Sequence, residues 1–187
     1  IVINEVLAHT DAPQSDAIEL FNTTNETINI GGWFISDSNN YKKFRIPDDT
    51  MLDGLSYIFF DEDDFNASMG VDPNDFGLNG AHGDEVYLLE ADADQKLLKF
   101  VDKVDFGASP NGESFGRYAD GVGPLVPMQT LTLGGVNSEP RVGPIVISEI
   151  QYSPADPGNL PAGVSVSDLE FIEIYNPTDA DVDLTGW

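Results

Sequence analysis

The chain contains two copies of one two-strand pattern, and this duplication restricts the folds that it can adopt. Residues 145–150 (IVISEI) repeat residues 1–6 (IVINEV), and residues 170–176 (EFIEIYN) repeat residues 16–22 (DAIELFN). In the second copy the loop between the strands is longer and rich in proline and glycine, at residues 153–168. A repeat with such a long period indicates tandem domains rather than a solenoid of short repeats.

The duplication also sets the expected domain boundaries. Residues 1–138 are expected to form one complete domain, residues 139–144 a linker, and residues 145–187 the opening strands of a second, incomplete domain. A stretch as short as the second copy buries too little surface to fold alone. We therefore expect its two strands to pair with, or swap into, another sheet edge, in the same chain or in a neighbour. Because the chain begins with Ile1 rather than methionine, we expect it to be a processed piece of a longer protein.

The charge balance disfavours several kinds of partner. The sequence holds 33 acidic and 8 basic residues and has a net charge of −25 at pH 7. Nucleic-acid affinity depends on Lys and Arg side chains that displace counterions, so we expect no nucleic-acid partner. No apolar run is long enough to cross a bilayer, so we expect no direct membrane insertion either. Such a surface suits metal cations, basic partners and a salty medium, although it could serve only as a coat that keeps the protein soluble.

The absence of cysteine excludes two further classes of site. Neither a disulfide framework nor a thiolate metal site can be built from this sequence.

Residues 1–119 have the pattern of a chain of many short strands. Apolar runs alternate with turns rich in Gly, Pro, Asn and Asp, and no segment keeps the 3.6-residue period of a helix. We expect one helical turn near residues 65–69, and an extended tail and linker over residues 120–143. The pattern predicts an all-β fold, an immunoglobulin-like β-sandwich. The expected strands are residues 1–8, 16–21, 27–30, 33–36, 42–46, 55–60, 85–89, 97–106 and 114–118.

Several motifs occur together in an order that is typical of one family of such β-sandwiches. The first copy carries IVINEV, AIELFN and GGWFISD, then residues 83–88 (GDEVYL), residues 114–118 (SFGRY) and residues 131–137 (LTLGGVN). The second copy carries EFIEIYNPT and VDLTGW. Together these motifs resemble the lamin-tail domain family as it occurs in bacterial secreted and surface proteins.

This resemblance implies an immunoglobulin-like sandwich of lamin-tail type, followed by a partial second copy. It implies a module without catalysis that tethers, or mediates contacts, within large secreted or surface proteins. In animal lamins the related domain binds nuclear partners and DNA, and the acidity of this chain argues against that role here. The family offers no catalytic residues to carry over.

One short motif matches a catalytic pattern, but its context does not. Residues 112–116 read G-x-S-x-G, the nucleophile elbow of α/β-hydrolases, with Ser114 in the place of the nucleophile. An elbow needs a strand before it, a helix after it and a histidine later in the chain. The only histidines, His9 and His82, both come earlier, and we expect them to lie in loops rather than to share a metal. We therefore expect that the protein is not an enzyme.

Glutamates interrupt the apolar strands at equivalent places of the two copies. They are Glu5 and Glu19 in the first copy and Glu149 and Glu173 in the second. A carboxylate in a half-buried strand needs a partner. The expected partners are backbone amides or a cationic side chain of the sheet, such as Arg117 or Lys103. The alternative is a cation shared by the two strands.

The long loop over residues 61–80 is the best candidate for a metal site. Ca²⁺ prefers six to eight oxygen ligands from carboxylates, carbonyls and water, and this loop supplies many. The spacing does not fit an EF-hand, so a solvated acidic loop is the alternative. We expect no cofactor other than a structural Ca²⁺ ion. Its candidate ligands are Asp61, Glu62, Asp63, Asp64, Asp72 and Asp75.

Two functions from different classes fit the sequence. The first is a non-catalytic adhesion, scaffolding or protein-interaction module of a larger secreted or cell-surface bacterial protein, which contacts a protein partner or a surface polymer. The alternative is a module that binds carbohydrate or another ligand through exposed aromatic rings such as Tyr41 and Tyr118. Trp33 and Trp187, each preceded by glycine, are expected to plug the two cores rather than to stack on a sugar.

Overall fold

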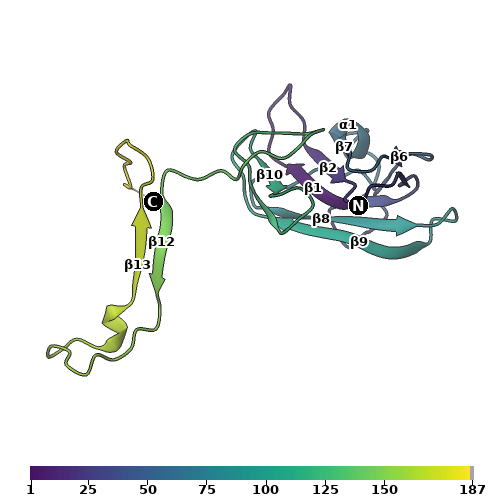
Figure 1. The fold of residues 1–187 in the computed structure, drawn as a ribbon. Coiled ribbons are helices and arrows are strands. Elements are labelled where there is room, and N and C mark those ends of the chain that lie inside the picture. The colour runs from purple at the N-terminus through teal and green to yellow at the C-terminus, as the bar shows by residue number, and fades with distance from the viewer. Residues whose placement is uncertain (186–187) are drawn as a thin grey trace. The chain divides into compact units, whose positions relative to one another are not determined.

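The computed structural model describes residues 1–185, which form two compact units (Figure 1). The first unit is Ile1–Arg141 and the second is Val142–Trp187. Gly186 and Trp187 lie outside the described residues, so the prediction that Trp187 plugs a core concerns a residue beyond the described part. In the described part of the chain, no helix is both long enough and apolar enough to cross a membrane.

The first unit is built from two antiparallel sheets and one short ribbon. The five-stranded sheet has the order β11-β10-β1-β2-β7, and the four-stranded sheet has the order β5-β4-β8-β9. The strands of the first sheet are β1 (Val2–Leu7), β2 (Ala17–Phe21), β7 (Tyr57–Asp61), β10 (Ser114–Arg117) and β11 (Leu125–Pro127). Those of the second are β4 (Phe34–Ser36), β5 (Phe44–Arg45), β8 (Asp84–Ala91) and β9 (Leu97–Phe106). The ribbon pairs β3 (Ile28–Asn29) with β6 (Met51–Leu52).

The core of this unit lies between the two large sheets. Core residues alternate along the strands, as the period of a β-strand requires, except in β1, where the register shift between Ile3 and Glu5 leaves both Ile3 and Val6 on the inner face. Ile3 and Val6 of β1 meet Ile18 and Leu20 of β2 in this core, and all four are fully buried. The four-stranded sheet contributes buried residues such as Ile35, Val86, Leu88 and Val104. The predicted all-β, immunoglobulin-like sandwich is therefore confirmed. Trp33 packs against this core from a partly buried position, in agreement with the role predicted for it.

Every expected strand overlaps a strand of the structure, whereas β6 and β11 were not predicted. The helical turn begins earlier than expected, as α1 (Glu62–Phe65) rather than near residues 65–69. The reason is a capping box, because the Asp61 side chain accepts from the main chain of Asp63 while Asp64 accepts from that of Asp61. The prediction of an extended tail after residue 119 is also wrong in part, since this stretch contains β11.

The segment after β11 returns across the outer face of the five-stranded sheet. We define residues 128–138 as the strap. Its Met128 amide donates to the carbonyl of Ser114 in β10, and its Asn137 side chain donates to the carbonyls of Asn4 and Arg117. The strap therefore closes the face of β1 and β2 that points away from the core.

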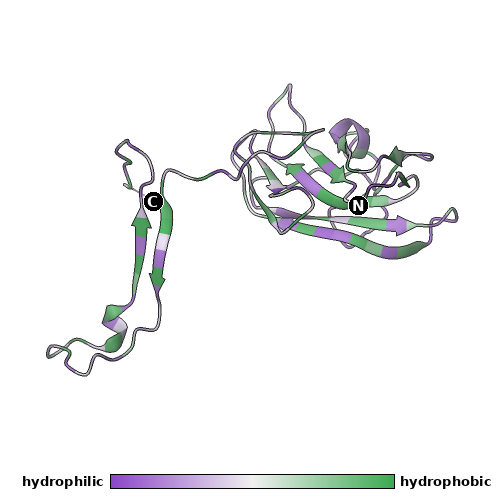
Figure 2. Cartoon of the chain, in the orientation of Figure 1, coloured by the Kyte–Doolittle hydropathy of each residue, from purple (hydrophilic) through white to green (hydrophobic). Residues whose placement is uncertain are grey.

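The second unit contains a hairpin that reproduces β1 and β2. Its strands are β12 (Val146–Gln151) and β13 (Phe171–Tyr175), which follows a short 3₁₀ helix, η1 (Val166–Leu169). Glu149 faces Glu173 just as Glu5 faces Glu19, and in both hairpins the register shifts one step before this pair. Figure 2 shows green, apolar stretches along β12 and β13 as along the strands of the first unit. We call β12 and β13 the second hairpin.

Candidate interaction site

Two carboxylates lie side by side beneath the strap. Glu5 and Glu19 are cross-strand partners on β1 and β2, and neither side chain has any exposed surface. The hydroxyl of Ser114 donates to Glu5 at 2.5 Å. The strap adds the amide of Thr132 at 3.1 Å and its hydroxyl at 2.9 Å. Glu5 is therefore held by three donors from two segments that are distant in the sequence.

Glu19 is held in the same way but with fewer donors. The side-chain amide of Asn4 donates to one oxygen at 3.0 Å, and the amide of Gly134 in the strap donates to the other at 2.5 Å. Burial raises the pKa of Glu19 to about 7, although both hydrogen bonds act in the opposite direction. The nearby carboxylates of Glu5 and Asp120 raise the pKa further. Ionising this group in the folded state is consequently unfavourable.

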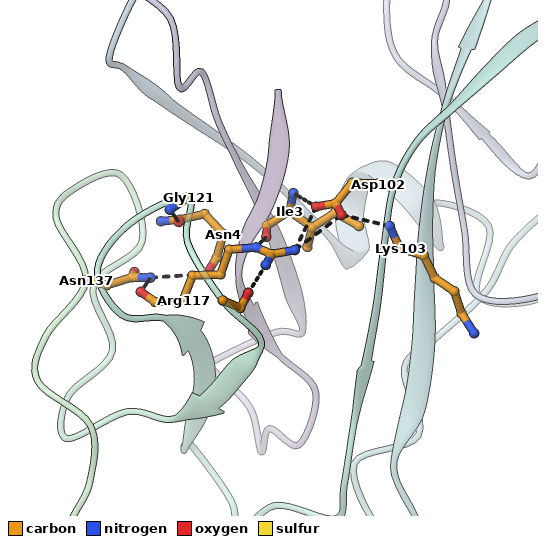
Figure 3. A network of polar contacts seen from close by, with 8 residues as sticks. Ile3, Asn4, Asp102, Lys103, Arg117, Gly121 and Asn137 are labelled. Atoms are coloured by element: carbon orange, nitrogen blue, oxygen red, sulfur yellow. Dashed lines mark hydrogen bonds and ion pairs between the residues drawn. The ribbon is translucent and has the colours of Figure 1, made fainter.

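The predicted cationic partners of these glutamates are used elsewhere. Arg117 donates to the carbonyl of Ile3 at 2.7 Å and pairs with Asp102 at 3.0 Å, as Figure 3 shows. Lys103 pairs with Glu85 and Asp105. The prediction of backbone amides as partners is confirmed, and the prediction of Arg117 or Lys103 is wrong. Arg117 instead links β10 and β1 of one sheet to β9 of the other, since Asp102 lies on β9.

Asp16 forms a second buried acidic position, which the sequence did not suggest. It lines a cleft of about 500 Å³ together with His9, Thr10, Glu62 and the loop over residues 77–81. The hydroxyl of Thr10 donates to Asp16 at 2.8 Å. Burial raises the pKa of Asp16 to about 6, and the neighbouring Glu62 adds to this effect. The cleft is therefore lined by acidic side chains, and ionising Asp16 within it is unfavourable.

The residues of the apparent hydrolase motif have structural positions. Ser114 begins strand β10, where a nucleophile elbow requires a helix, and its hydroxyl donates to Glu5 rather than to a histidine. The Nδ1 atom of His9 lies 2.7 Å from the carbonyl of Ser109, and that of His82 lies 3.3 Å from Asn79. These contacts hold loops in place and assemble no triad.

Four of the six Ca²⁺ candidates, namely Asp61, Asp64, Asp72 and Asp75, accept hydrogen bonds from nearby backbone amides. Asp61 caps α1, and the amide of Asp61 in turn binds Asp64. Asp75 accepts from the amide and hydroxyl of Ser68, whose hydrogen bond lowers the pKa of this carboxyl. Asp72 accepts from the amide of Asn74. Over residues 1–185, no three acidic or histidine side chains gather as a metal site would require.

Thermal unfolding decides between a Ca²⁺ site in this loop and the alternative of a solvated acidic loop. A ligand that binds only the folded protein at a hundredfold excess over its Kd adds about 2.7 kcal/mol to the free energy of unfolding. Because most of these carboxylates already accept backbone donors, we expect millimolar CaCl₂ to raise the midpoint no more than MgCl₂ at equal ionic strength. A rise specific to Ca²⁺ and reversed by EDTA would contradict this expectation.

The second hairpin repeats the carboxylate pair without its cover. The Ser148 hydroxyl donates to Glu173 at 2.6 Å, as Asn4 donates to Glu19 in the first unit. Glu149 and Glu173 are nevertheless exposed. In the described residues no strap lies over them, so their remaining lone pairs face solvent.

The apolar residues of the second hairpin are also uncovered. Ile3, Val6, Ile18 and Leu20 are fully buried, whereas each of their four equivalents is at least half exposed. These equivalents are Ile147, Ile150, Ile172 and Ile174. A lone two-stranded hairpin is at best marginally stable in water. Within residues 1–185, this core-forming face is therefore exposed to solvent.

Both edges of the second hairpin lack a neighbouring strand in the described residues. In the first unit β10 pairs with β1 and β7 pairs with β2. The sheet of β12 and β13, by contrast, has two strands only. Unpaired amides and carbonyls along an edge form a template for another strand. The second hairpin combines two such edges with an apolar face and a carboxylate pair.

The strap residues are the functional positions that sequence reasoning missed. Residues 131–137 marked the end of the domain, but nothing in their spacing linked Thr132 and Gly134 to carboxylates more than a hundred residues away. The one sequence signal that could have indicated a turn here was the pair Gly134 and Gly135. Gly134 has a φ of +84°, which favours glycine, and this conformation turns the strap over the glutamate pair.

Comparison with known families agrees with this architecture. The family model described as Lamin Tail Domain matches residues 1–108 and 138–187, which include both hairpins and most of the chain. No curated protein and no solved structure gave a match. The chain therefore belongs to the lamin tail domain family, whose members are immunoglobulin-like modules of protein interaction without catalytic activity.

Proposed function

We propose that this protein is an adhesion or scaffolding module of a larger secreted or cell-surface bacterial protein, and that the second hairpin is its contact element. The observation that supports this most is the match to the lamin tail domain model, since that family consists of protein-interaction modules. Within residues 1–185, the core-type isoleucines of the second hairpin are also exposed and its edges are unpaired. Main-chain pairing along such an edge supplies affinity, and the alternate side chains supply specificity. The partner is a protein or a surface polymer. The net charge of −25 favours a basic or neutral one.

Self-association of the full chain tests this function, because a neighbouring copy offers the same sheet edges. We expect sedimentation velocity in moderate salt to show association that increases with concentration. Ile172→Lys places a charge on the apolar face and is expected to abolish it. Met69→Lys makes the same charge change at an exposed loop residue and serves as the matched control. A strictly monomeric protein in which protease rapidly removes the second hairpin at all concentrations would overturn the proposal.

Carbohydrate binding is a second candidate, favoured by one cluster of aromatic rings. The ring of Tyr41 lies 5.2 Å from that of Tyr87 and 4.9 Å from that of Phe100, which is more than half exposed. Lys103 lies over the ring of Tyr87 at 5.2 Å. Aromatic faces with a charged neighbour are suited to stacking on sugar rings. Tyr118, the other predicted aromatic, is also more than half exposed.

A glycan panel separates the two functions. Carbohydrate binding would produce a signal that Tyr41→Ala removes and that Ile172→Lys leaves unchanged. A signal lost instead in Tyr118→Ala would move the site to the end of β10. Association lost only in Ile172→Lys, with no glycan signal, would leave the second hairpin as the single contact element.

A further inference from the structure

We propose that the cleft beside Asp16 binds the guanidinium group of an arginine side chain that a partner protein presents. The inference goes beyond the proposed function, because the cleft belongs to the first unit and does not involve the second hairpin. The cleft, of about 500 Å³, lies where β1 ends, β2 and α1 begin, and the loop before β8 passes. Its lining residues are 8–10, Asp16, Glu62 and 77–81.

Asp16 is a buried carboxylate that has no cationic partner within the described residues. It is only 7% exposed, yet its side chain lines the cleft. Burial is the main cause that raises its pKa, and among the charged side chains Glu62 raises this pKa whereas His9 lowers it. None of the ion pairs in residues 1–185 includes Asp16 or Glu62. Because a buried charge is favourable only when it is paired, the cleft is suited to a cation from outside the chain.

Neutral donors hold one oxygen of each carboxylate and leave further lone pairs for a ligand. The hydroxyl of Thr10 donates to Oδ1 of Asp16 at 2.8 Å, and the side-chain amide of Asn66 donates to Oε1 of Glu62 at 3.3 Å. The main chain of Leu78 also acts on Asp16 as a donor. An ionised carboxylate offers about four lone-pair sites, so both side chains keep acceptor capacity. The two carboxylates therefore form a fixed pair of acceptors at one cleft.

The walls of the cleft suit the methylene stem of a long cationic side chain, which packs on apolar surface while its charged end reaches a polar group. A Cβ atom at Gly80 would lie 2.1 Å from the carbonyl oxygen of Ala8, so this part of the wall is close-packed main chain. A Cβ atom at Gly77 would lie 3.6 Å from Oε1 of Glu62, which is an ordinary contact distance. The space beside Glu62 is therefore open to a ligand. The apolar side chains of the wall are Ala8, Leu78 and Ala81.

Arginine fits this cleft better than lysine for two physical reasons. A guanidinium group is more weakly hydrated than an ammonium group, so its transfer to a buried carboxylate costs less. Its five N–H donors lie in one plane and can reach two acceptors together, whereas an ammonium group acts as a point charge. The net charge of −25 also attracts a basic partner surface on which such an arginine lies.

The test is a titration of the full chain with N-acetyl-argininamide, followed by amide NMR spectra at about pH 7.5 in about 0.15 M salt. At that pH Asp16, whose pKa is about 6, is largely ionised. We expect saturable shifts in residues 8–10 and 77–81. N-acetyl-citrullinamide has nearly the same shape but no charge, and it is expected to bind at least about tenfold more weakly. N-acetyl-lysinamide is expected to bind at least about threefold more weakly.

Three variants separate the cleft from the acidic surface. Asp16→Asn keeps the shape of the side chain and, since burial disfavours the charge, is expected to fold and to weaken binding at least about fivefold. Gly77→Leu fills the space beside Glu62 without changing any charge and is expected to weaken binding by a similar factor. Asp63→Asn is the matched control, because it removes an exposed charge next to Glu62 on α1, and it is expected to leave the affinity unchanged.

Two outcomes would overturn the inference. The first is equal binding of the arginine and citrulline probes, or an affinity that neither Asp16→Asn nor Gly77→Leu lowers, because cations would then bind only to the acidic surface. The second is a lysine probe that binds as tightly as the arginine probe, which contradicts the assignment to guanidinium. Self-association that depends on Ile172 is measured separately, so a failure here and a failure of the proposed function remain distinguishable.

Discussion

Between pH values of about 4.5 and 8, Glu19 is expected to lower the free energy of unfolding by about 3 kcal/mol, and Glu19→Gln is expected to abolish this change. The estimate follows from a pKa of about 7 in the folded protein, raised by burial from an ordinary value of 4.5. Each unit of difference corresponds to about 1.4 kcal/mol between the folded and unfolded states. The free energy of unfolding is the quantity to compare.

The direction of the effect follows from proton linkage. A carboxyl whose pKa is raised by folding binds its proton more tightly in the folded protein, so the folded state is favoured at low pH. The wild-type protein is therefore expected to gain stability as the pH falls through 7, with the full gain reached below about 4.5. Asp16, whose pKa is raised to about 6, adds a gain of the same sign at lower pH.

The measurement is urea unfolding at several pH values. The change of the free energy of unfolding with pH matters more than its value at any single pH. Glutamine at position 19 cannot accept from both Asn4 and Gly134, so Glu19→Gln changes stability at every pH. Only the part of this stability difference that varies with pH reports the titration of Glu19. Glu173→Gln is the matched control, because it makes the same change at the equivalent, exposed carboxylate of the second hairpin. A wild-type slope retained in Glu19→Gln would mean that Glu19 is not the titrating group.

The fold was predictable from the sequence largely because short-range patterns determine it. Alternating apolar residues located each expected strand, and the repeated IVINEV and AIELFN motifs predicted two equivalent hairpins, which the shared register confirms. Local chemistry explains the main positional error, since the capping box at Asp61 starts α1 before the apolar residue Phe65. A pattern of apolar residues contains no information about such a cap.

Only part of the polar site was predictable from the sequence: the kind of hydrogen-bond donor, but not the residues that supply it. A glutamate that interrupts a buried strand requires a donor, and that rule correctly predicted backbone amides for Glu5 and Glu19. It could not identify Thr132 or Gly134, because the contact depends on how the strap turns in space after β11. Arg117 was an attractive partner by charge alone. Its position near the end of β10 instead directs it to Asp102 on the neighbouring sheet.

The matched pair Ile18→Ala and Ile172→Ala is expected to give the largest contrast between the two copies. Ile18 is fully buried in the core, and removing its side chain beyond Cβ is expected to cost about 2–5 kcal/mol through lost burial and the cavity that remains. Ile172 has the same place in the second hairpin but is 65% exposed. Its replacement is expected to change stability by no more than about 0.5 kcal/mol.

Urea unfolding in a Trp187→Phe background measures the first of these effects, because Trp33 alone then reports on the first unit. Amide hydrogen exchange in β12 and β13 measures the second. If Ile172→Ala destabilised the second hairpin as strongly as Ile18→Ala destabilises the first unit, its apolar face would already be covered in solution. A covered face has no binding energy left for a partner, since the apolar area that remains exposed is the area that association can bury. The small effect expected at Ile172 is thus the condition under which the second hairpin can act as the contact element.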